Sequence, residues 1–578
     1  MKYISNIREA FVSRTLPTAL AVLRDLDTPI SLSVHLLIQD GSNEAWDQIY
    51  SKTISPTDYL AEDYDKFARD YTATKLLSKS PNFLNRNLKV KALDAFQEAE
   101  YQCWLCNRSF LDGSIDYLLR DADLPTLTTI KHSVSKVLGR APSLQSVVAC
   151  GGWGPGSSFA LSQREASPEL KCEYENTVTL PLLRALQGIE LPRWFEEKSS
   201  WFSKSPSWQL VPGNLITTVP KNGKTDRTIA IEPGLNSFVQ KGIGSKIRDR
   251  LMRFGINLND QSINQHGALL AMSDGLSTLD LKAASDSISL ELCEAIIPKD
   301  WLALLMLARS PRGTFDKRNT KNKTWFEYQK ISSMGNGFTF ELESAIFFSV
   351  LLACGLTPKE CYVYGDDLIV PRTHALRVIN TLACLGFSTN KEKSFVDGLF
   401  FESCGVHVFN GVDVTPIQMK DAFHGSKDII IFANKLRLFA HCRADYFGCQ
   451  RRYLPSYRMC VGWLSPSIRT RCRGPVGSGL TLFVNQKEAT FSKYNRKRGA
   501  FLFQQLVPKL RIVEAEFETL LYYRLWQMES IQMSSIYDRN EWSEILASSR
   551  SNEVKQTLWK YRTARGYSER WYTLGDWQ

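Results

Sequence analysis

The sequence lacks the long apolar run that a membrane span requires. The longest apolar stretch, residues 345–356, is shorter than the roughly 20 residues needed to cross a bilayer, and it closely follows Glu341 and Glu343. The first eleven residues contain no apolar core and no cleavage-like site, so we expect no signal peptide. Internal repeats and low-complexity segments are also missing. The sequence therefore does not predict a membrane-spanning or repetitive architecture.

Cysteine pairs with the spacing of a metal site are nearly absent. The 13 cysteines are odd in number and scattered, which is typical of a reducing cytosol rather than of a disulfide framework. Cys103 and Cys106 form a single C-x-x-C without a second pair or a nearby histidine, so we expect buried thiols and no zinc site. We expect the same of the later group, Cys442, Cys449, Cys460 and Cys472.

The low hydrophobicity that marks a disordered chain is not found either. Hydrophobic residues make up 43% and aromatic residues 11% of 578 positions, as in folded proteins, and this length predicts several domains. Lysine and arginine number 71 against 60 acidic residues, which gives a net charge of +11. This basic excess is compatible with a polyanionic partner but does not specify one.

Two adjacent carboxylates lie at the bend of an apolar hairpin predicted over residues 361–370, CYVYGDDLIV. Strand-forming residues flank the bend, and Gly365 permits a tight turn before Asp366 and Asp367. A Gly-Asp-Asp tripeptide alone is more often a surface turn. The two apolar flanks favour a site where water or a divalent cation balances the charge.

A second acidic segment, residues 278–286, combines a hydrophobic strand with the start of a helix. Asp280 lies at the predicted strand end, and Asp286 follows six residues later. Taken singly, Asp286 fits an acid at a helix N-terminus and Asp280 a surface acid. Together with Asp366 and Asp367 they predict a rim of carboxylates that holds two Mg²⁺ ions roughly 3.5–4 Å apart.

Basic segments precede and follow these acids. Lys221, Lys224 and Arg227 surround a predicted turn between two strands, which suits a triphosphate or nucleic acid and, taken alone, equally a solvated hairpin. Lys391 and Lys393 follow the acidic hairpin, and a lysine near a departing pyrophosphate could donate a proton.

A glycine-rich loop lies between the two acidic segments, at residues 332–340. Gly335 and Gly337 permit close approach of a template or nucleotide backbone, and Asn336 could hydrogen-bond Asp286 or a ribose hydroxyl. A Gly-Asn-Gly loop alone is usually only a turn. Helical periodicity predicts helices over residues 89–105, 180–191, 285–297, 337–352 and 513–528, and a basic hairpin over 311–329.

The order of these segments resembles the motifs of viral RNA-dependent RNA polymerases. It is closest to the replicase catalytic (beta) subunits of single-stranded RNA bacteriophages, the levivirus or Qβ-like group. The matching stretches, dense over residues 216–416, are TTVPKNGKTDRTIAIEPG, INQHG, DLKAASDSISLELC, KISSMGNGFTFELES, VYGDD and ESCGVHVFNGVDVTP. Outside this range only the length, the order and a glycine-rich loop at 152–156 fit the family.

The resemblance implies that Asp280, Asp366 and Asp367 bind the catalytic metals, two Mg²⁺ ions with Mn²⁺ as a substitute. It further implies that Lys221, Lys224 and Arg227 bind the triphosphate and that Asp286 and Asn336 recognise the ribose 2′-hydroxyl. Gly335 and Gly337 would contact the RNA, and Lys393 would act as general acid. Lys393 is preferred to Lys391 because the family keeps a lysine two residues before the Phe. Phe401 departs from the arginine expected before Glu402, which leaves the primer-strand contact open.

The implied fold is α+β, a right-hand polymerase with fingers, a palm built on an antiparallel sheet, and a thumb. Its expected divisions are 1–212 for the N-terminal region and fingers, 213–275 for the basic finger, 276–420 for the palm with a fingers insertion near 305–330, and 421–578 for the thumb and C-terminal region. The implied activity is replication and transcription of a phage single-stranded RNA genome in the cytoplasm of an infected bacterium. Implied partners are RNA template and product, nucleoside triphosphates, host elongation factors Tu and Ts and a ribosomal RNA-binding protein, without a membrane.

Two other functions fit part of this pattern. A reverse transcriptase shares the paired-Asp hairpin, but Asp286 and Asn336 argue against it, because enzymes that use deoxynucleotides usually block the 2′-hydroxyl with a bulky side chain. A catalytically inactive RNA-binding scaffold is the other alternative. The presence of all the expected acids argues against it.

Overall fold

The structure, a computed structural model, describes residues 9–80, 87–159, 161, 166–174, 177–189, 209–315, 324–443, 447–489, 491–514, 520–521, 523–525, 527 and 553–578. Helices dominate the first third: α2 (Leu16–Leu26), α3 (Pro29–Asp40), α4 (Asn43–Ser51), α5 (Tyr64–Lys75), α6 (Leu88–Leu111), α7 (Ser114–Asp121), α8 (Leu127–Leu138), α9 (Leu144–Ala149), α10 (Pro168–Tyr174) and α11 (Leu180–Leu186). Two short strands, β1 (Thr177–Val178) and β2 (Gln209–Leu210), pair in parallel.

Strands and helices alternate in the middle of the chain. The strands are β3 (Gly213–Pro220), β4 (Asp226–Ile231), β5 (Leu276–Lys282), β6 (Arg312–Thr314), β7 (Phe326–Glu327), β8 (Tyr362–Tyr364), β9 (Asp367–Pro371), β10 (Ser388–Thr389), β11 (Phe400–Ser403), β12 (Val406–Phe409) and β13 (Val412–Asp413). The helices are α13 (Gly234–Met252), α14 (Ser262–Leu270), α15 (Leu290–Ile296), α16 (Lys299–Ala308), α17 (Thr339–Ala353) and α18 (Arg372–Cys384).

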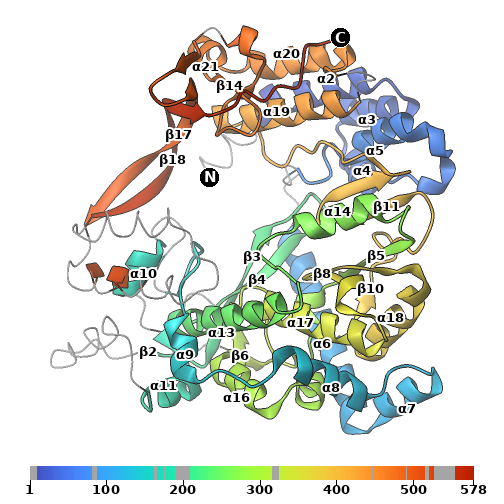
Figure 1. The fold of residues 1–578 in the computed structure, drawn as a ribbon, viewed down its shortest axis with the longest axis vertical. Coiled ribbons are helices and arrows are strands. Elements are labelled where there is room, and N and C mark those ends of the chain that lie inside the picture. Colours follow the sequence, from blue (N-terminus) through green and yellow to red (C-terminus); the bar gives the residue numbers. More distant parts are fainter. Residues whose placement is uncertain are drawn as a thin grey trace.

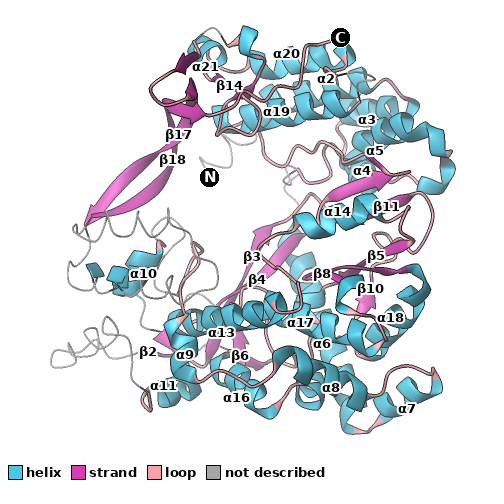
Figure 2. Ribbon diagram, in the orientation of Figure 1, coloured by secondary structure: helices cyan, strands magenta, loops and turns pink. Residues whose placement is uncertain are grey.

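The C-terminal part again begins with helices and ends in a sheet. Its elements are α19 (Ser426–Cys442), α20 (Leu454–Gly462), α21 (Pro466–Arg471), β14 (Arg473–Gly474), β15 (Leu482–Phe483), β16 (Lys493–Asn495), β17 (Ala500–Glu514) and β18 (Glu553–Ser568). Figure 2 shows that β17 and β18 form a long two-stranded ribbon that extends beyond the neighbouring helices. The fold class predicted from the sequence, a mixture of helices and antiparallel sheet, is confirmed.

The acidic segments lie on one antiparallel sheet of order β10-β5-β9-β8. Alternate residues of β9 face opposite sides of the sheet, and both sides are covered. Leu368 and Val370 pack into the core that contains α17 and α18, whereas Ile369 packs against α14 and the β11–β12 hairpin. All three side chains have no exposed surface, which explains why β9 is a continuous apolar run.

Helix α17 forms the centre of this core. A helix that is apolar around its whole circumference is typically buried, and Phe347 and Phe348 of α17 indeed have no exposed surface. Burying each such side chain contributes about 1.5–3 kcal/mol to stability. The apolar stretch after Glu343 is therefore a core helix. In the described part of the chain, no helix combines the length and apolar composition of a transmembrane segment.

A second sheet, of order β4-β3-β6-β7, joins the two basic segments of the sequence. Strand β3 pairs antiparallel with β4 and parallel with β6, so residues 213–231 and the hairpin predicted over 311–329 share one sheet. The pairing of Arg312 with Glu327 confirms that this hairpin exists. Its basic tip, with Lys317, Arg318, Lys321 and Lys323, lies outside the described residues.

The two ends of the chain share a separate hydrophobic core. Buried residues between Phe11 and Leu77 form one cluster with buried residues between Ile417 and Leu574. In Figure 1 the blue helices α2 and α3 accordingly lie beside the orange helices α19 and α20. The first helices thus stabilise the C-terminal region.

Several predicted elements differ in their ends. The helix predicted from 89 extends over the whole of α6, and α17 matches the helix predicted over 337–352. The helix predicted over 285–297 is wrong at its start, because the chain makes a 3₁₀ turn at Ala284–Asp286 and α15 begins only after Ser289 caps its N-terminus. The helix predicted over 180–191 ends at Leu186 in α11. The helix predicted from 513 is wrong at its start, because β17 continues to Glu514; much of its remainder lies outside the described residues.

The cysteines are mostly buried thiols, as the spacing indicates. All 13 are free, and Cys103 and Cys106 are 2% and 8% exposed. Burial raises the pKa of both thiols. Cys442 is the departure from the prediction, because it lies on the surface at the end of α19.

Candidate active site

Three carboxylates meet where β5, β8 and β9 come together. The antiparallel register pairs Asp280 with Asp367, and Tyr364 with Asp367, so that Gly365 and Asp366 form the turn between β8 and β9. Gly365 has φ of +61°, a left-handed conformation that favours glycine. Its N–H donates to Ser344 Oγ of α17 at 3.0 Å, which fixes the turn against the core helix.

Crowding and burial disfavour the charged state of Asp366 and Asp367. Burial and the neighbouring Asp280 raise the pKa of Asp366. Burial, Asp366 and Asp280 raise the pKa of Asp367 to about 7. Like charges at one buried position are costly unless a cation compensates them. Carboxylate oxygens are the ligands that Mg²⁺ prefers, so a cation bound here would stabilise the charged forms of Asp366 and Asp367.

The side chain of Asp280 has protein partners on both oxygens. Asn390 Nδ2 donates to Asp280 Oδ2 at 2.8 Å, and Lys393 Nζ lies 3.4 Å from Asp280 Oδ1. Asn390 N donates to the backbone carbonyl oxygen of Asp280 at 2.8 Å, which holds this segment beside β5, and Ser394 Oγ accepts from the Asp280 N–H. No group of three or more His, Cys, Asp or Glu in the described residues is gathered closely enough to form a metal site by itself.

Lys393 is the lysine of its segment that reaches the acids, whereas Lys391 is an exposed residue for which the structure gives no contact with them. Although burial opposes its charge, Glu402 and Asp280 raise the pKa of Lys393, which keeps the side chain protonated. A protonated amine at this position can donate a proton to a leaving group.

The basic hairpin β3–β4 faces the same carboxylates. Burial and the cationic Arg227 and Lys393 lower the pKa of Lys221, while Asp280 and Asp366 oppose this shift, so all five charges lie within electrostatic range. The turn is rigidly built, because Asn222 Oδ1 accepts from two following N–H groups and Gly223 packs against the ring of Tyr50. Lys224 is exposed at this turn.

Asp286 is held by a lysine that the sequence interpretation did not assign. Lys330 Nζ lies 2.9 Å from Asp286 Oδ1 and 2.9 Å from Glu100 Oε1, and the lysine side chain has no exposed surface. Burial opposes its charge, but Asp286 and Glu100 together raise the pKa of Lys330. The ammonium also lies 4.1 Å from the centre of the Phe96 ring. Helix α6 therefore helps to position Asp286.

The glycine-rich loop packs against the protein itself. A Cβ on Gly335 would lie 2.2 Å from the carbonyl oxygen of Ala230, and one on Gly337 would lie 2.8 Å from the backbone nitrogen of Lys241. Asn336 Oδ1 accepts from Phe338 N at 2.9 Å, and the structure gives no bond between Asn336 and Asp286. Its Nδ2 atom is buried and has no hydrogen-bond partner among the described residues. That amide remains available to a ligand, and the RNA contact of the two glycines stays a prediction.

A comparison with models of protein families shows which family the chain belongs to. The model of the family described as "RNA replicase, beta-chain" matches residues 30–444, well over half of the sequence. The chain belongs to this family of RNA-directed RNA polymerases. The match includes each acid, lysine and glycine described above and also reaches helices α3 to α11, where sequence motifs are sparse.

Named relatives agree with this assignment. The RNA-directed RNA polymerase subunit beta of Qbeta virus strain MX1 is 36% identical over 492 residues, which cover 82% of this chain and 79% of that protein. The beta chain of Escherichia phage MS2 is 35% identical, with 69% and 73% covered. The subunit of Escherichia virus Qbeta is 36% identical, and the alignment spans 65% of this chain and 63% of that protein's length.

Solved structures of viral polymerases resemble the replicase chain more distantly. The RNA-dependent RNA polymerase of a human picorbirnavirus has a TM-score of 0.36 at 12% identity, with 66% of this chain and 83% of that one covered. The polymerase of BmCPV at its elongation state has a TM-score of 0.34 at 12% identity, with 78% and 36% covered.

An N-terminal helix supplies cations that the sequence interpretation missed. Lys75 of α5 and Lys79, which follows it, act electrostatically on Glu402 of β11, whose pKa burial raises. Burial lowers the pKa of Lys75, and Glu402 opposes that shift. Phe401, where an arginine was expected, is fully buried in the core. Positive charge near Glu402 thus comes first from Lys393 and then from this distant segment, which no local motif could have revealed.

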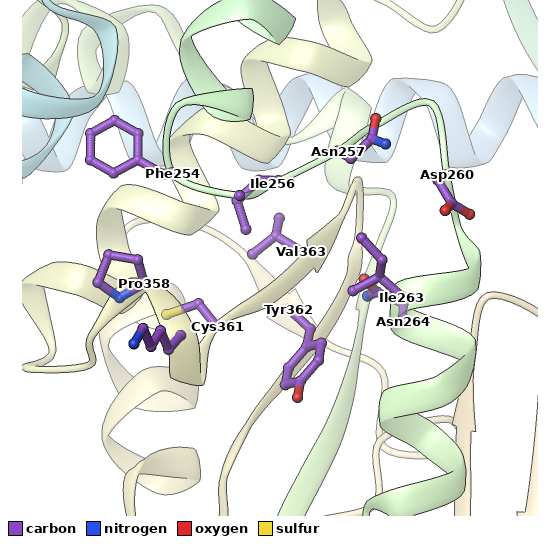
Figure 3. A pocket seen from close by; sticks show the side chains of 12 residues that line it. Phe254, Ile256, Asn257, Asp260, Ile263, Asn264, Pro358, Cys361, Tyr362 and Val363 are labelled. Carbon is purple, nitrogen blue, oxygen red and sulfur yellow. The ribbon is translucent and has the colours of Figure 1, made fainter.

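A separate pocket lies behind the acidic hairpin. It has a volume of about 240 Å³ and is lined by residues that follow α13 and by β8, with Tyr362 and Val363 on one wall. Figure 3 shows Asn264 at its rim, where Nδ2 of that residue donates to the carbonyl oxygen of Asp367 at 3.1 Å. Asp280, Asp366 and Asp367 are not among the residues that line this pocket.

Proposed function

We propose that this RNA-directed RNA polymerase replicates and transcribes a phage single-stranded RNA genome by two-metal nucleotidyl transfer. The observation that carries the proposal is the pairing of Asp280 with Asp367 beside Asp366, opposite a hairpin with Lys221 and Arg227. Bound Mg²⁺, or Mn²⁺ in its place, would activate the 3′-hydroxyl of the growing strand and neutralise the leaving pyrophosphate.

The chain's own residues bind and orient the reactants. Lys221, Lys224 and Arg227 bind the triphosphate of the incoming nucleotide through charge-assisted hydrogen bonds. Lys393 Nζ donates a proton to the pyrophosphate oxygen as the bond to the α-phosphorus breaks. Positioning and charge neutralisation account for most of the rate in such transfers.

Asn336 and Asp286 distinguish ribose from deoxyribose. The buried Nδ2 of Asn336, which has no partner among the described residues, donates to the 2′-hydroxyl of the incoming nucleotide. A deoxynucleotide lacks this hydroxyl and would leave Nδ2 unsatisfied, so the site rejects it. Asp286 accepts from the same hydroxyl through the oxygen that Lys330 leaves free. This sugar selection favours a polymerase of RNA over a reverse transcriptase.

The same proposal covers the divisions of the chain and its partners. Residues 1–212 form the N-terminal region and fingers, 213–275 the basic finger, 276–420 the palm with a fingers insertion near 305–330, and 421–578 the thumb and C-terminal region. Helices α2–α4 share a core with the last of these divisions. Membership in the replicase family supports assembly with host elongation factors Tu and Ts and a ribosomal RNA-binding protein in the cytoplasm of the infected bacterium. The remaining partners are template RNA, product RNA and nucleoside triphosphates.

Substitution of the turn acid tests the metal assignment. Asp366→Asn should reduce templated nucleotide incorporation more than about 1,000-fold, because it removes a ligand charge, while RNA binding persists. Incorporation of labelled UTP on an RNA template, with RNA affinity measured in parallel, gives both quantities. The matched control is Asp397→Asn, an exposed acid that should keep full activity. Substantial synthesis by purified Asp366→Asn would refute the assignment.

A further inference from the structure

The C-terminal sheet carries an excess of positive charge that the polymerase reaction does not use. Over residues 491–513 and 560–570, ten lysine and arginine side chains are exposed, and Glu569 is the single exposed acid. These cations are Lys493, Arg496, Lys497, Arg498, Lys509, Arg511, Lys560, Arg562, Arg565 and Arg570. None of them forms an ion pair with a residue in the described part of the chain. Such a one-sided surface matches a polyanion.

The register of the ribbon spreads these charges along its length. Arg565 pairs with Gln504 and Arg562 with Val507 across the two strands, so the arginines do not face acidic partners. At 3.3–3.4 Å per residue, the stretch from Lys560 to Arg565 covers about 17 Å, which is the rise of about five stacked nucleotides. Because successive side chains of a strand face opposite sides, Lys560 and Arg562 lie on one face of β18 and Arg565 and Tyr567 on the other. Positive charge therefore extends along both faces of the ribbon.

A hollow with aromatic walls lies at the base of the ribbon. Its volume is about 820 Å³, and its lining includes Phe503, Tyr567, Tyr572 and the turn Val476–Gly479. Tyr567 and Tyr572 are 42% and 57% exposed. The guanidinium of Arg498 lies 4.4 Å from the centre of the Tyr567 ring. Rings and cations together form the type of platform on which unpaired bases stack.

Hydrogen bonds and packing hold this platform in place. Val476 N donates to the carbonyl oxygen of Tyr572 at 2.9 Å, and Leu480 pairs with Leu506 of β17. At its other end β17 is also supported, because Val513 packs with Leu170 of α10. Figure 1 shows the ribbon running from the C-terminal helices toward α10, on the opposite side of the view from β8 and β10. These contacts hold the surface in a defined position, and it is separate from Asp280, Asp366 and Asp367.

We infer that the β16–β17–β18 sheet binds single-stranded RNA, with bases stacked on Tyr567 and Tyr572 in the hollow and phosphates on Arg562, Arg565 and the neighbouring cations. A duplex fits less well, because its bases are stacked inside and cannot reach the rings. The strand held here is template or product outside the catalytic centre. This second RNA site is independent of the metal assignment.

Two double variants of the full chain test the site. Arg562→Gln/Arg565→Gln should weaken binding of a fluorescent 12-nucleotide single-stranded RNA about tenfold and should reduce the slope of log K against log salt by about 1.4. Tyr567→Ala/Tyr572→Ala should weaken binding by a similar factor with an unchanged slope, because stacking involves no counterion release. The control is Lys131→Glu/Lys136→Glu, two exposed lysines of α8, which should leave affinity and slope unchanged.

The readouts separate this site from catalysis and from other partners. All variants should extend a short primed template at the parent rate, and a shift in the melting temperature would reveal a folding defect. Unchanged affinity in both ribbon variants would overturn the proposal, as would equal weakening for duplex RNA. If the variants bind RNA normally but lose a copurifying acidic protein, the surface is a protein interface and the RNA site is wrong.

Discussion

The hairpin β8–β9 and the two-stranded ribbon β17–β18 use the same secondary structure for opposite kinds of charge. The first is short, and its strands are buried between α14, α17 and α18, with carboxylates at the turn. The second is long, exposed over much of its surface and lined with lysine and arginine. Burial raises the pKa of Asp367 in the first hairpin to about 7, whereas exposed cations in water lose little hydration.

The difference shows how burial decides what a charge can do. Neighbouring half-buried carboxylates whose charged forms are disfavoured favour a bound cation, so they indicate one kind of occupant. Exposed cations cost little individually, so only their number and their lack of acidic neighbours indicate a partner. Substitutions that alter burial around each charge should therefore separate the two cases.

The largest effect is expected where a buried ion pair is broken. Lys330→Met leaves Asp286 and Glu100 without a cation in a buried environment, which should lower the free energy of unfolding by about 3–5 kcal/mol. Arg312→Met breaks the pair with Glu327, whose two side chains are 50% and 70% exposed, and should cost less than about 1 kcal/mol. Chemical denaturation followed by tryptophan fluorescence compares them, and equal small losses would contradict the buried role of Lys330.

A smaller effect is expected from the turn glycines of the two sheets. Gly365 and Gly499 have φ of +61° and +60°, so alanine introduces similar backbone strain at both. A Cβ at Gly365 would also lie 2.5 Å from Phe340 Cε2, whereas a Cβ at Gly499 would have no described atom within 4 Å. Gly365→Ala should therefore displace Asp366 and lower nucleotide incorporation about 100-fold. Gly499→Ala should keep full activity, and similar rates for both would show that the catalytic turn tolerates displacement.

The short hairpin could be predicted from the sequence because its signals are local. Apolar strands on both sides, a glycine and two acids occur within ten residues, and the register then pairs Asp280 with Asp367 as the metal hypothesis requires. The helices α6 and α17 could also be predicted, since each has an uninterrupted helical pattern. Lys393 was selected by resemblance, and it lies beside Asp280.

The long ribbon could not be predicted because its two strands are far apart in the sequence. Residues 500–514 pair with residues 553–568, which are distant from them along the chain. Long-range pairing also explains the missed residues: Lys75 reaches Glu402, and Lys330 joins Asp286 to Glu100, across large separations along the chain. Single-sequence patterns describe neighbours along the chain, whereas these contacts depend on tertiary packing.

A pH-dependent effect concerns a buried acid beneath the β8–β9 turn. Burial raises the pKa of Glu343 in α17 to about 8 from its ordinary 4.5, although a hydrogen bond from Ser285 Oγ at 2.7 Å opposes the shift. The folded chain therefore binds a proton that the unfolded chain has lost between pH 4.5 and 8, so this group's stabilising contribution is complete below pH 4.5 and is lost as the pH rises through 8.

Glu343→Gln should remove that dependence, because glutamine does not titrate. Relative to the variant, the parent should lose up to about 1.4 kcal/mol of unfolding free energy for each pH unit between 4.5 and 8. Glu294→Gln, at an exposed position of α15, should give a constant difference over the same range. Denaturation curves at several pH values measure both. Parallel stability profiles for the parent and Glu343→Gln would mean that Glu343 is charged at neutral pH, and the distinction between buried and exposed acids would then fail at this position.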